Sequence, residues 1–164
     1  MLKKHSIVGI ASALTIGASA TFAATSTGTL GVTAIVVDAC IVAATPMAFI
    51  DIDGSAATNQ TTPGVITVTC TSAKTGVTIT LDGGLNEDTG QRNMTSINTT
   101  TDLPYNIYTD SGHTAEVAVG GEIFNGDIPA VIPEIITVYG QIPSGAYGAD
   151  LLYGDTVTIT VDYP

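Results

Sequence analysis

The sequence Thr-Leu-Gly-Val-Thr-Ala-Ile-Val-Val at residues 29–37 begins with an alternating pattern that is the starting point for predicting the fold. Successive side chains of an extended strand point to opposite faces, so one face carries Leu30, Val32, Ala34 and Val36. An alternating strand of this kind needs a sheet to join. The sheet can belong to the same domain or to a second copy of the protein, and the rest of the chain is needed to decide.

A secretory signal peptide is predicted ahead of this stretch. A basic start at residues 3–5 leads into an apolar run at residues 7–18, and small residues follow as far as Ala23. The alternative is a membrane anchor, but the run is shorter than the ~20 apolar residues that span a bilayer. We therefore expect export of the protein, cleavage of residues 1–23, and a mature chain that begins at Ala24.

The composition favours one all-β domain. The 164 residues include 18 glycines and no tryptophan, and 45% of them are hydrophobic. A length of this order suits a single domain, and the abundance of threonine and valine favours strands over helices. No segment longer than about ten residues shows a helical period. Short strands with turn signals between them predict a β-sandwich.

The mature chain is strongly acidic. It keeps only Lys74 and Arg92 of the four basic residues but all 15 acids, which gives a formal charge of −13. A surface of this charge argues against binding to nucleic acid or to anionic lipid.

The two cysteines, Cys40 and Cys70, are expected to pair because exported proteins usually oxidise their thiols. Metal binding is a poor alternative, since the chain has no CxxC motif and His113 is the only histidine of the mature chain. Cys70 also falls on the apolar face of a predicted strand, where a disulfide would close the core.

The expected strands are separated by turn signals of Gly, Asp, Ser and Pro. The most regular of them is the last, in which Val157, Ile159, Val161 and Tyr163 face one way. Nothing follows it to pair with, so we expect an open edge beside a hydrophobic groove. The segments with a strand pattern are residues 29–42, 64–71, 77–81, 92–94, 105–108, 115–119, 135–141 and 156–163.

Three stretches carry a resemblance to a known family: LPYNIYTD at residues 103–110, YGQIPSGAY at residues 139–147 and DTVTITV at residues 155–161. Together with the signal peptide and the two cysteines, they resemble the spore coat protein U domain family. That family includes the Csu-type pilins of archaic chaperone–usher pili in Gram-negative bacteria. The resemblance covers nearly the whole mature chain.

The resemblance implies an incomplete immunoglobulin-like β-sandwich that lacks its last strand and is completed by donor-strand exchange. A periplasmic chaperone lends a strand to the groove, and at the outer-membrane usher the N-terminal strand of the next pilin subunit replaces it. Residues 24–37 would then be the donor and residues 38–164 the pilin domain. The donor side chains would be Leu30, Val32, Ala34 and Val36, and the acceptor groove would include Val157, Ile159 and Val161.

The implied function is that of a structural subunit of a surface pilus that serves adhesion and biofilm formation and needs no cofactor. A second interpretation stays open, in which residues 29–37 are an ordinary first strand. The protein would then be a self-contained secreted β-sandwich that binds a ligand such as a carbohydrate. Three tyrosines could form the platform for a sugar: Tyr105, Tyr108 and Tyr147.

Catalytic and metal sites have little support. His113 lies beside a glycine turn without a nucleophile motif, so we expect a solvated turn histidine. Residues 51–55 resemble the start of a calcium loop, but Thr62 stands where the final glutamate would be required. Three carboxylates in a glycine-rich turn could form an acid–base pair but are better explained as solvated side chains: Asp82, Glu87 and Asp88.

Overall fold

The computed structural model describes residues 29–34, 38–50, 52, 58–98, 101–147 and 152–164. The chain divides into two units, residues 1–35 and residues 36–164. The second unit is all-β, and its described residues form nine strands. These are β1 (Cys40–Thr45), β2 (Gln60–Cys70), β3 (Lys74–Leu81), β4 (Arg92–Ser96), β5 (Asp102–Tyr108), β6 (Gly121–Ile128), β7 (Glu134–Ile142), β8 (Tyr153–Gly154) and β9 (Ile159–Asp162).

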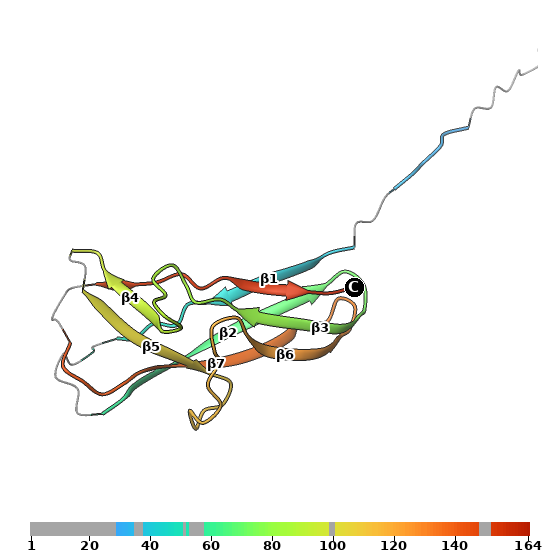
Figure 1. Cartoon of the computed structure of the whole chain (residues 1–164). Coiled ribbons are helices and arrows are strands. Elements are labelled where there is room, and N and C mark those ends of the chain that lie inside the picture. Colours follow the sequence, from blue (N-terminus) through green and yellow to red (C-terminus); the bar gives the residue numbers. More distant parts are fainter. Residues whose placement is uncertain (1–28, 35–37, 51, 53–57, 99–100, 148–151) are drawn as a thin grey trace, which may run out of the picture. The chain divides into compact units, whose positions relative to one another are not determined.

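The strands form two sheets in which every paired neighbour is antiparallel (Figure 1). The larger sheet has the order β1-β2-β7-β5-β4-β8, and the smaller has the order β6-β3-β9. Side chains from both sheets meet in one hydrophobic core, which makes the domain a β-sandwich. The described residues include no helix that is long and apolar enough to cross a membrane.

Alternation along the strands produces this core, as the sequence predicts. In β3 the side chains of Val77, Ile79 and Leu81 are buried, while the threonines between them are only partly covered. The same alternation holds in β2, β5 and β7. One face of each strand is therefore buried and the other faces solvent. This difference sets the register of each pairing. The remaining buried residues of these strands are Ile66, Val68, Cys70, Leu103, Tyr105, Ile107, Ile136, Val138 and Ile142.

The predicted disulfide is present and joins β1 to β2. Cys40 and Cys70 are opposite each other at the start of the β1–β2 pairing, and their sulfur atoms are bonded. From there the two strands stay paired in register as far as Thr45 and Val65. The Thr71 N–H also donates to the Ala39 carbonyl, so the pairing extends one residue beyond the disulfide.

Several predicted strands have different limits in the structure. β2 begins at Gln60 and includes Pro63, which is tolerated because this part of β2 pairs with β7 but not with β1. β5 begins at Asp102 rather than at Tyr105. The predicted strand at 156–163 is paired to β3 only from Ile159 onward. The reason is that β8 pairs with β4 in the larger sheet, so the chain crosses between the sheets at residues 155–158.

β6 is a strand that the sequence did not predict, because two glycines and an aspartate interrupt its alternation. It is an edge strand whose pairing with β3 contains two register shifts. The strand predicted at 115–119 was wrong. That segment has an isolated bridge between Glu116 and Tyr108, and the Val117 N–H donates to the Ile107 carbonyl. Its carbonyls then turn toward a buried arginine instead of a neighbouring strand.

The predicted first strand at 29–42 is also wrong in its limits. Residues 29–34 are not part of any strand, and β1 begins only at Cys40. Leu30 and Val32 are 89% and 84% exposed. The predicted signal peptide, the first residues of the mature chain and Val36 lie outside the described residues, as does most of the segment that resembles a calcium loop.

Candidate functional site

The candidate site is a groove between one edge of each sheet. β1 is an edge strand bonded to β2, and β9 is an edge strand bonded to β3. Within the described part of the chain, no strand pairs with the outer edge of either one. A cavity of about 280 Å³ lies between them, with Ala44 and Thr45 on one side and Val157 and Ile159 on the other. The two unpaired edges thus border one apolar opening.

The floor and walls of this groove are hydrophobic. Core residues from four strands form its floor: Ile66, Leu81, Ile107 and Val138. Larger side chains line its walls, two of them from the connection after β1 and three from strands: Met47, Phe49, Met94, Tyr105 and Tyr153. Met47 and Phe49 contact the surface over Gly64 and Gly140, where any Cβ would collide with them. The two glycines therefore make room for these side chains at the groove.

The three residues predicted for the acceptor groove all lie on the inner face of the last extended segment. Val157, Ile159 and Val161 are partly buried and pack against the core. Val157 and Ile159 line the cavity, whereas Val161 lies further along β9 and packs on the core without lining it. Sequence reasoning missed Met47, Phe49 and Tyr153, whose only signal was an apolar character outside any alternating run.

Asp155 fastens the end of the groove where the chain crosses between the sheets. Its carboxylate accepts hydrogen bonds from the Tyr105 hydroxyl at 2.6 Å and from the Leu85 N–H at 2.9 Å. Burial raises the pKa of Tyr105, and the hydrogen bond to Asp155 raises it further, so the phenol remains a donor. Gly84 has φ +81° and lies against this carboxylate, where a Cβ would be 2.0 Å from Asp155 Oδ2.

Asp82 holds the next part of the same crossing segment. Its Oδ1 accepts the N–H of Thr158 at 2.7 Å and that of Gly84 at 2.9 Å. Partial desolvation raises the pKa of Asp82, but the hydrogen bonds from Thr158 and Gly84 outweigh it and leave the pKa below its ordinary value. The Asp82 N–H also donates to the Thr158 carbonyl. Residues 155–158, which lack strand pairing, are thus held by side chains at the rim of the groove.

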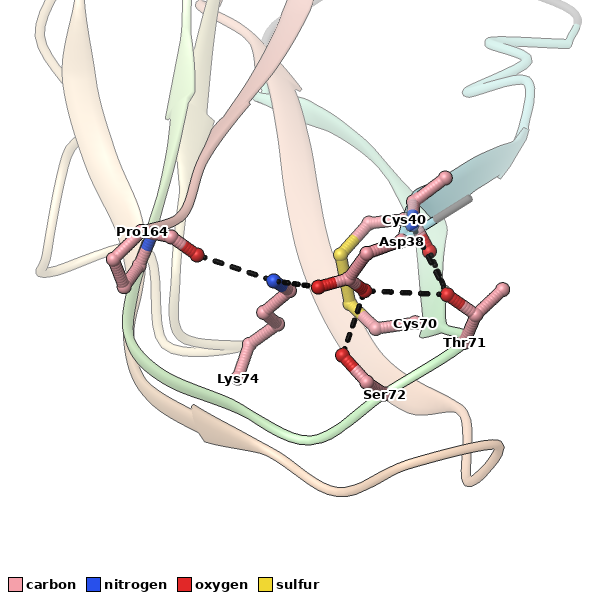
Figure 2. A network of polar contacts seen from close by, with 8 residues as sticks. Asp38, Cys40, Cys70, Thr71, Ser72, Lys74 and Pro164 are labelled. Atoms are coloured by element: carbon pink, nitrogen blue, oxygen red, sulfur yellow. Dashed lines mark hydrogen bonds and ion pairs between the residues drawn. A yellow bond between two sulfur atoms is a disulfide. The ribbon is translucent and has the colours of Figure 1, made fainter. Parts of the chain in front are cut away.

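A polar network lies beside the disulfide and links the residues before β1 to the C-terminal end of the chain (Figure 2). Lys74 Nζ lies 2.5 Å from Asp38 Oδ2 and 3.1 Å from the Pro164 carbonyl oxygen, and it lies over the ring of Tyr163. The hydrogen bond from Lys74, followed by that from the Ser72 hydroxyl, lowers the pKa of Asp38. This network brings the residues before β1, the start of β3 and the end of β9 together.

Arg92 is buried between the two sheets, and within the described residues its guanidinium bonds to backbone carbonyls. Its guanidinium donates to the carbonyls of Leu81, Asp82, Val117 and Ala118. Burial lowers the pKa of Arg92, and the nearby Tyr105 and Asp82 side chains oppose this effect. Its planar donors hold the end of β3 and the loop before β6 in one arrangement. Both cations of the predicted mature chain are therefore structural, which its charge alone did not reveal.

The other residues considered for catalysis or sugar binding have structural contacts among the described residues. Glu87 caps a turn by accepting the Gly90 N–H, while Asp82 holds the crossing segment. The three tyrosines considered as a platform do not share one surface: Tyr105 points inward to Asp155, Tyr147 donates to the Pro143 carbonyl, and Tyr108 is buried. No group of three metal-binding side chains occurs in the described regions.

His113 was expected to be a solvated turn histidine, and this was wrong. Its ring packs edge-on against Tyr108 and Tyr139, with centroid distances of 5.1 and 6.2 Å. Its backbone has φ +55°, and its N–H donates to the Asp110 carbonyl. Asp110 in turn accepts the N–H groups of Thr114 and Ala115, which folds this loop back and places the imidazole over the outer face of β5 and β7.

A model of the Spore Coat Protein U domain matches residues 26–160. The chain belongs to the Spore Coat Protein U domain family. No curated protein matches it. Among solved structures, the chain described here is similar to a chain of the CsuC–CsuE chaperone–tip adhesion subunit pre-assembly complex from archaic chaperone-usher Csu pili of Acinetobacter baumannii. The two share 19% sequence identity with a TM-score of 0.54 over 77% of this chain, which spans 40% of the matched chain. That likeness supports the all-β fold.

Proposed function

We propose that this protein is a structural subunit of a chaperone–usher pilus and polymerises by donor-strand exchange, with residues 24–37 as the donor. The observation that carries the proposal is the uncovered apolar groove between two unpaired strand edges. A second strand alongside β1 and β9 would satisfy both rows of backbone groups and cover the cavity. Leu30, Val32 and Ala34 supply an alternating apolar face, and each is exposed in the single chain.

The edges of the two sheets differ in a way that supports this proposal. β6, at the far edge of the smaller sheet, carries Glu122 and Asp127 and has two register shifts, which are features that block pairing with another chain. β1 has neither charges nor shifts: its sequence is Cys-Ile-Val-Ala-Ala-Thr, paired to β2 in register throughout. The edge at β6, which is protected against pairing, lies away from the groove. The unprotected edge at β1 borders it.

The direction of the donor follows from the positions of the strand ends. β1 starts beside the disulfide, and β9 ends there, because Lys74 bonds both Asp38 and Pro164. The N-terminal segment therefore joins the domain at this end, next to Asp38. In a linear head-to-tail fibre it must enter the neighbouring groove from that groove's opposite end. The donor would run parallel to β1 and antiparallel to β9.

The free energy of burying the donor side chains is consistent with a stable contact between subunits. Burial of a valine- or leucine-sized side chain contributes about 1.5–3 kcal/mol, so Leu30, Val32 and Val36 together contribute roughly 5–9 kcal/mol before backbone hydrogen bonds. The partners in this mechanism are a periplasmic chaperone, an outer-membrane usher and neighbouring pilin subunits. The protein would pass through the periplasm to the cell surface and serve adhesion and biofilm formation there.

The proposal is tested with the chaperone-bound subunit and a synthetic peptide of residues 24–37. The peptide should displace the chaperone and leave a stable subunit–peptide complex, whereas a scrambled peptide of the same composition should not. Deletion of residues 24–37 should leave the chaperone complex intact but abolish joining to the preceding subunit. A deletion variant that loses its fold instead would show that this segment is a strand of its own domain, and the proposal would fail.

A further inference from the structure

The larger sheet has an outer face that is built from uncharged residues. This outer face points away from the core and consists of every second residue in four ranges: 41–45 of β1, 61–69 of β2, 106–108 of β5 and 135–141 of β7. None of these residues is charged, although the chain has 15 acids. The strand pairing places them in rows across the sheet, and in one row Tyr139 lies between Pro63 and Tyr108.

Acidic residues border this outer face. Glu116 is opposite Tyr108 beyond the edge of β5, and Asp102 lies where β5 pairs with β4. The outer side of the smaller sheet, by contrast, carries Glu122 and Asp162 on its own strands. Acids around an uncharged surface repel polyanions such as nucleic acid and acidic polysaccharides, but they do not repel a neutral polymer. The charge pattern therefore favours an uncharged partner.

One end of the outer face combines aromatic and amide side chains. Asn106 is opposite Gln141, and Tyr108 is opposite Tyr139. The Tyr108 hydroxyl lies 3.4 Å from Asn106 Nδ2 and 3.5 Å from Gln141 Oε1, so these contacts are long. Within the described residues, the Tyr139 hydroxyl and the Gln141 side-chain N–H groups have no hydrogen-bond partner. These groups can therefore bond to a ligand without breaking a contact inside the protein.

The loop after β5 holds the tyrosine rings in place. His113 packs edge-on against Tyr108 and Tyr139, and Asp110 fixes the loop by accepting the N–H groups of Thr114 and Ala115. Tyr139 stays partly exposed. A ring that is held before binding loses less conformational entropy when a ligand packs on it.

We propose that the outer face binds a chain of a neutral polysaccharide at a site centred on Tyr139. The C–H groups of a sugar ring pack on the tyrosine ring, while sugar hydroxyls exchange hydrogen bonds with the Tyr139 hydroxyl and with the amides of Gln141 and Asn106. This site is separate from the groove, because residues of the outer face alternate with core residues along the same strands. Both surfaces can therefore be occupied together, and the site does not depend on polymerisation.

The test is native electrophoresis of the mature chain through gels that contain a polysaccharide, because a chain this acidic migrates readily and a bound polymer slows it. The neutral polymers are hydroxyethyl cellulose, mannan and dextran, and alginate is the acidic one. An excess of the peptide of residues 24–37 is present, so that the groove is filled if it accepts a donor. Tyr139→Ala removes the ring, and Gln141→Leu removes the amide at nearly constant size. Tyr163→Ala is the matched control, since this tyrosine is 39% exposed and lies outside the outer face.

A neutral polymer should slow the wild type and alginate should not. Binding should be about tenfold weaker for Tyr139→Ala and about fivefold weaker for Gln141→Leu, and unchanged for Tyr163→Ala. Tyr139→Ala also removes the contact with His113, so Gln141→Leu decides the outcome if that variant does not fold. Migration that none of the three neutral polymers slows would overturn the proposal, as would equal binding by the wild type and Gln141→Leu. Sedimentation that shows self-association abolished by Gln141→Leu, without any slowing by a neutral polymer, would assign the outer face to a second copy of the chain instead.

Discussion

Replacing Leu30 with alanine should weaken the binding of the donor strand to the neighbouring subunit without lowering the stability of the subunit itself. In the single chain this side chain is 89% exposed, so its truncation removes almost no internal contact. In a neighbouring groove it would be buried, where Leu→Ala costs about 2–5 kcal/mol. The flexible side chains of Met47 and Met94 line that groove and can partly fill the gap, which favours the low end. A loss of about 2–3 kcal/mol is a roughly 30- to 150-fold weaker joint.

The assay is the guanidinium-induced dissociation of a two-subunit complex, measured beside thermal unfolding of the chaperone-free monomer. Thr33→Ala is the matched control, since this residue is also exposed but lies on the opposite face of the donor. We expect a large effect from Leu30→Ala, little from Thr33→Ala, and no change in either monomer. A larger effect from Thr33→Ala would show that the register is shifted by one residue. A lower melting temperature of the Leu30→Ala monomer would refute the reasoning, because the segment would then belong to its own domain.

Three further predictions concern the framework of the groove. Replacing Cys40 and Cys70 with serine opens a loop with a sequence separation of 30, which should cost about 3.6 kcal/mol by the chain-entropy estimate, measured as the free energy of unfolding. Arg92→Leu removes one donor from each of four carbonyls, of which those of Leu81 and Ala118 keep the N–H groups of Gly120 and Gly121, and it should cost about 3 kcal/mol. Arg92→Lys should recover only part of this because a single ammonium cannot reach all four carbonyls. Asp38 has a pKa below its ordinary value of 3.8, so its ion pair with Lys74 stabilises the fold above that pH and is lost as the pH falls through the lowered pKa. The unfolding midpoint of Asp38→Asn should therefore lie below that of the wild type at pH 7 and converge with it in strong acid, and equal midpoints at pH 7 would contradict this role.

Most of the core was predictable because it depends on period-two alternation. Val77, Ile79 and Leu81 are buried where the pattern places them. The pairing of the two cysteines was predicted on a different ground, the expected export of the protein, and the disulfide is present. Alternation indicates which face of a strand is apolar. It does not indicate which other strand pairs with that strand. The last extended segment is the clear case: its pattern runs unbroken, yet its pairing changes from the larger sheet to the smaller at residues 155–158.

The polar supports of the groove could not be predicted, because they join residues far apart in sequence. Asp155 bonds Tyr105 across 50 positions, and Lys74 bonds the Pro164 carbonyl across 90. Each of these residues resembles an ordinary surface residue in its local sequence. The role of Arg92 could not be predicted either, because it lies in a weakly patterned polar stretch. Only the folded chain shows that four carbonyls converge on its guanidinium.

The most direct test of the central claim is to find where the donor side chains lie in an assembled fibre. A photoreactive amino acid at position 32 would be cross-linked in fibres grown from an equal mixture of isotope-labelled and unlabelled subunits, and the products mapped by mass spectrometry. Donor-strand exchange predicts cross-links to Val157, Ile159 and their groove neighbours, with labelled and unlabelled peptides joined together. Cross-links confined to peptides of one isotope would place the strand in its own domain and contradict the account.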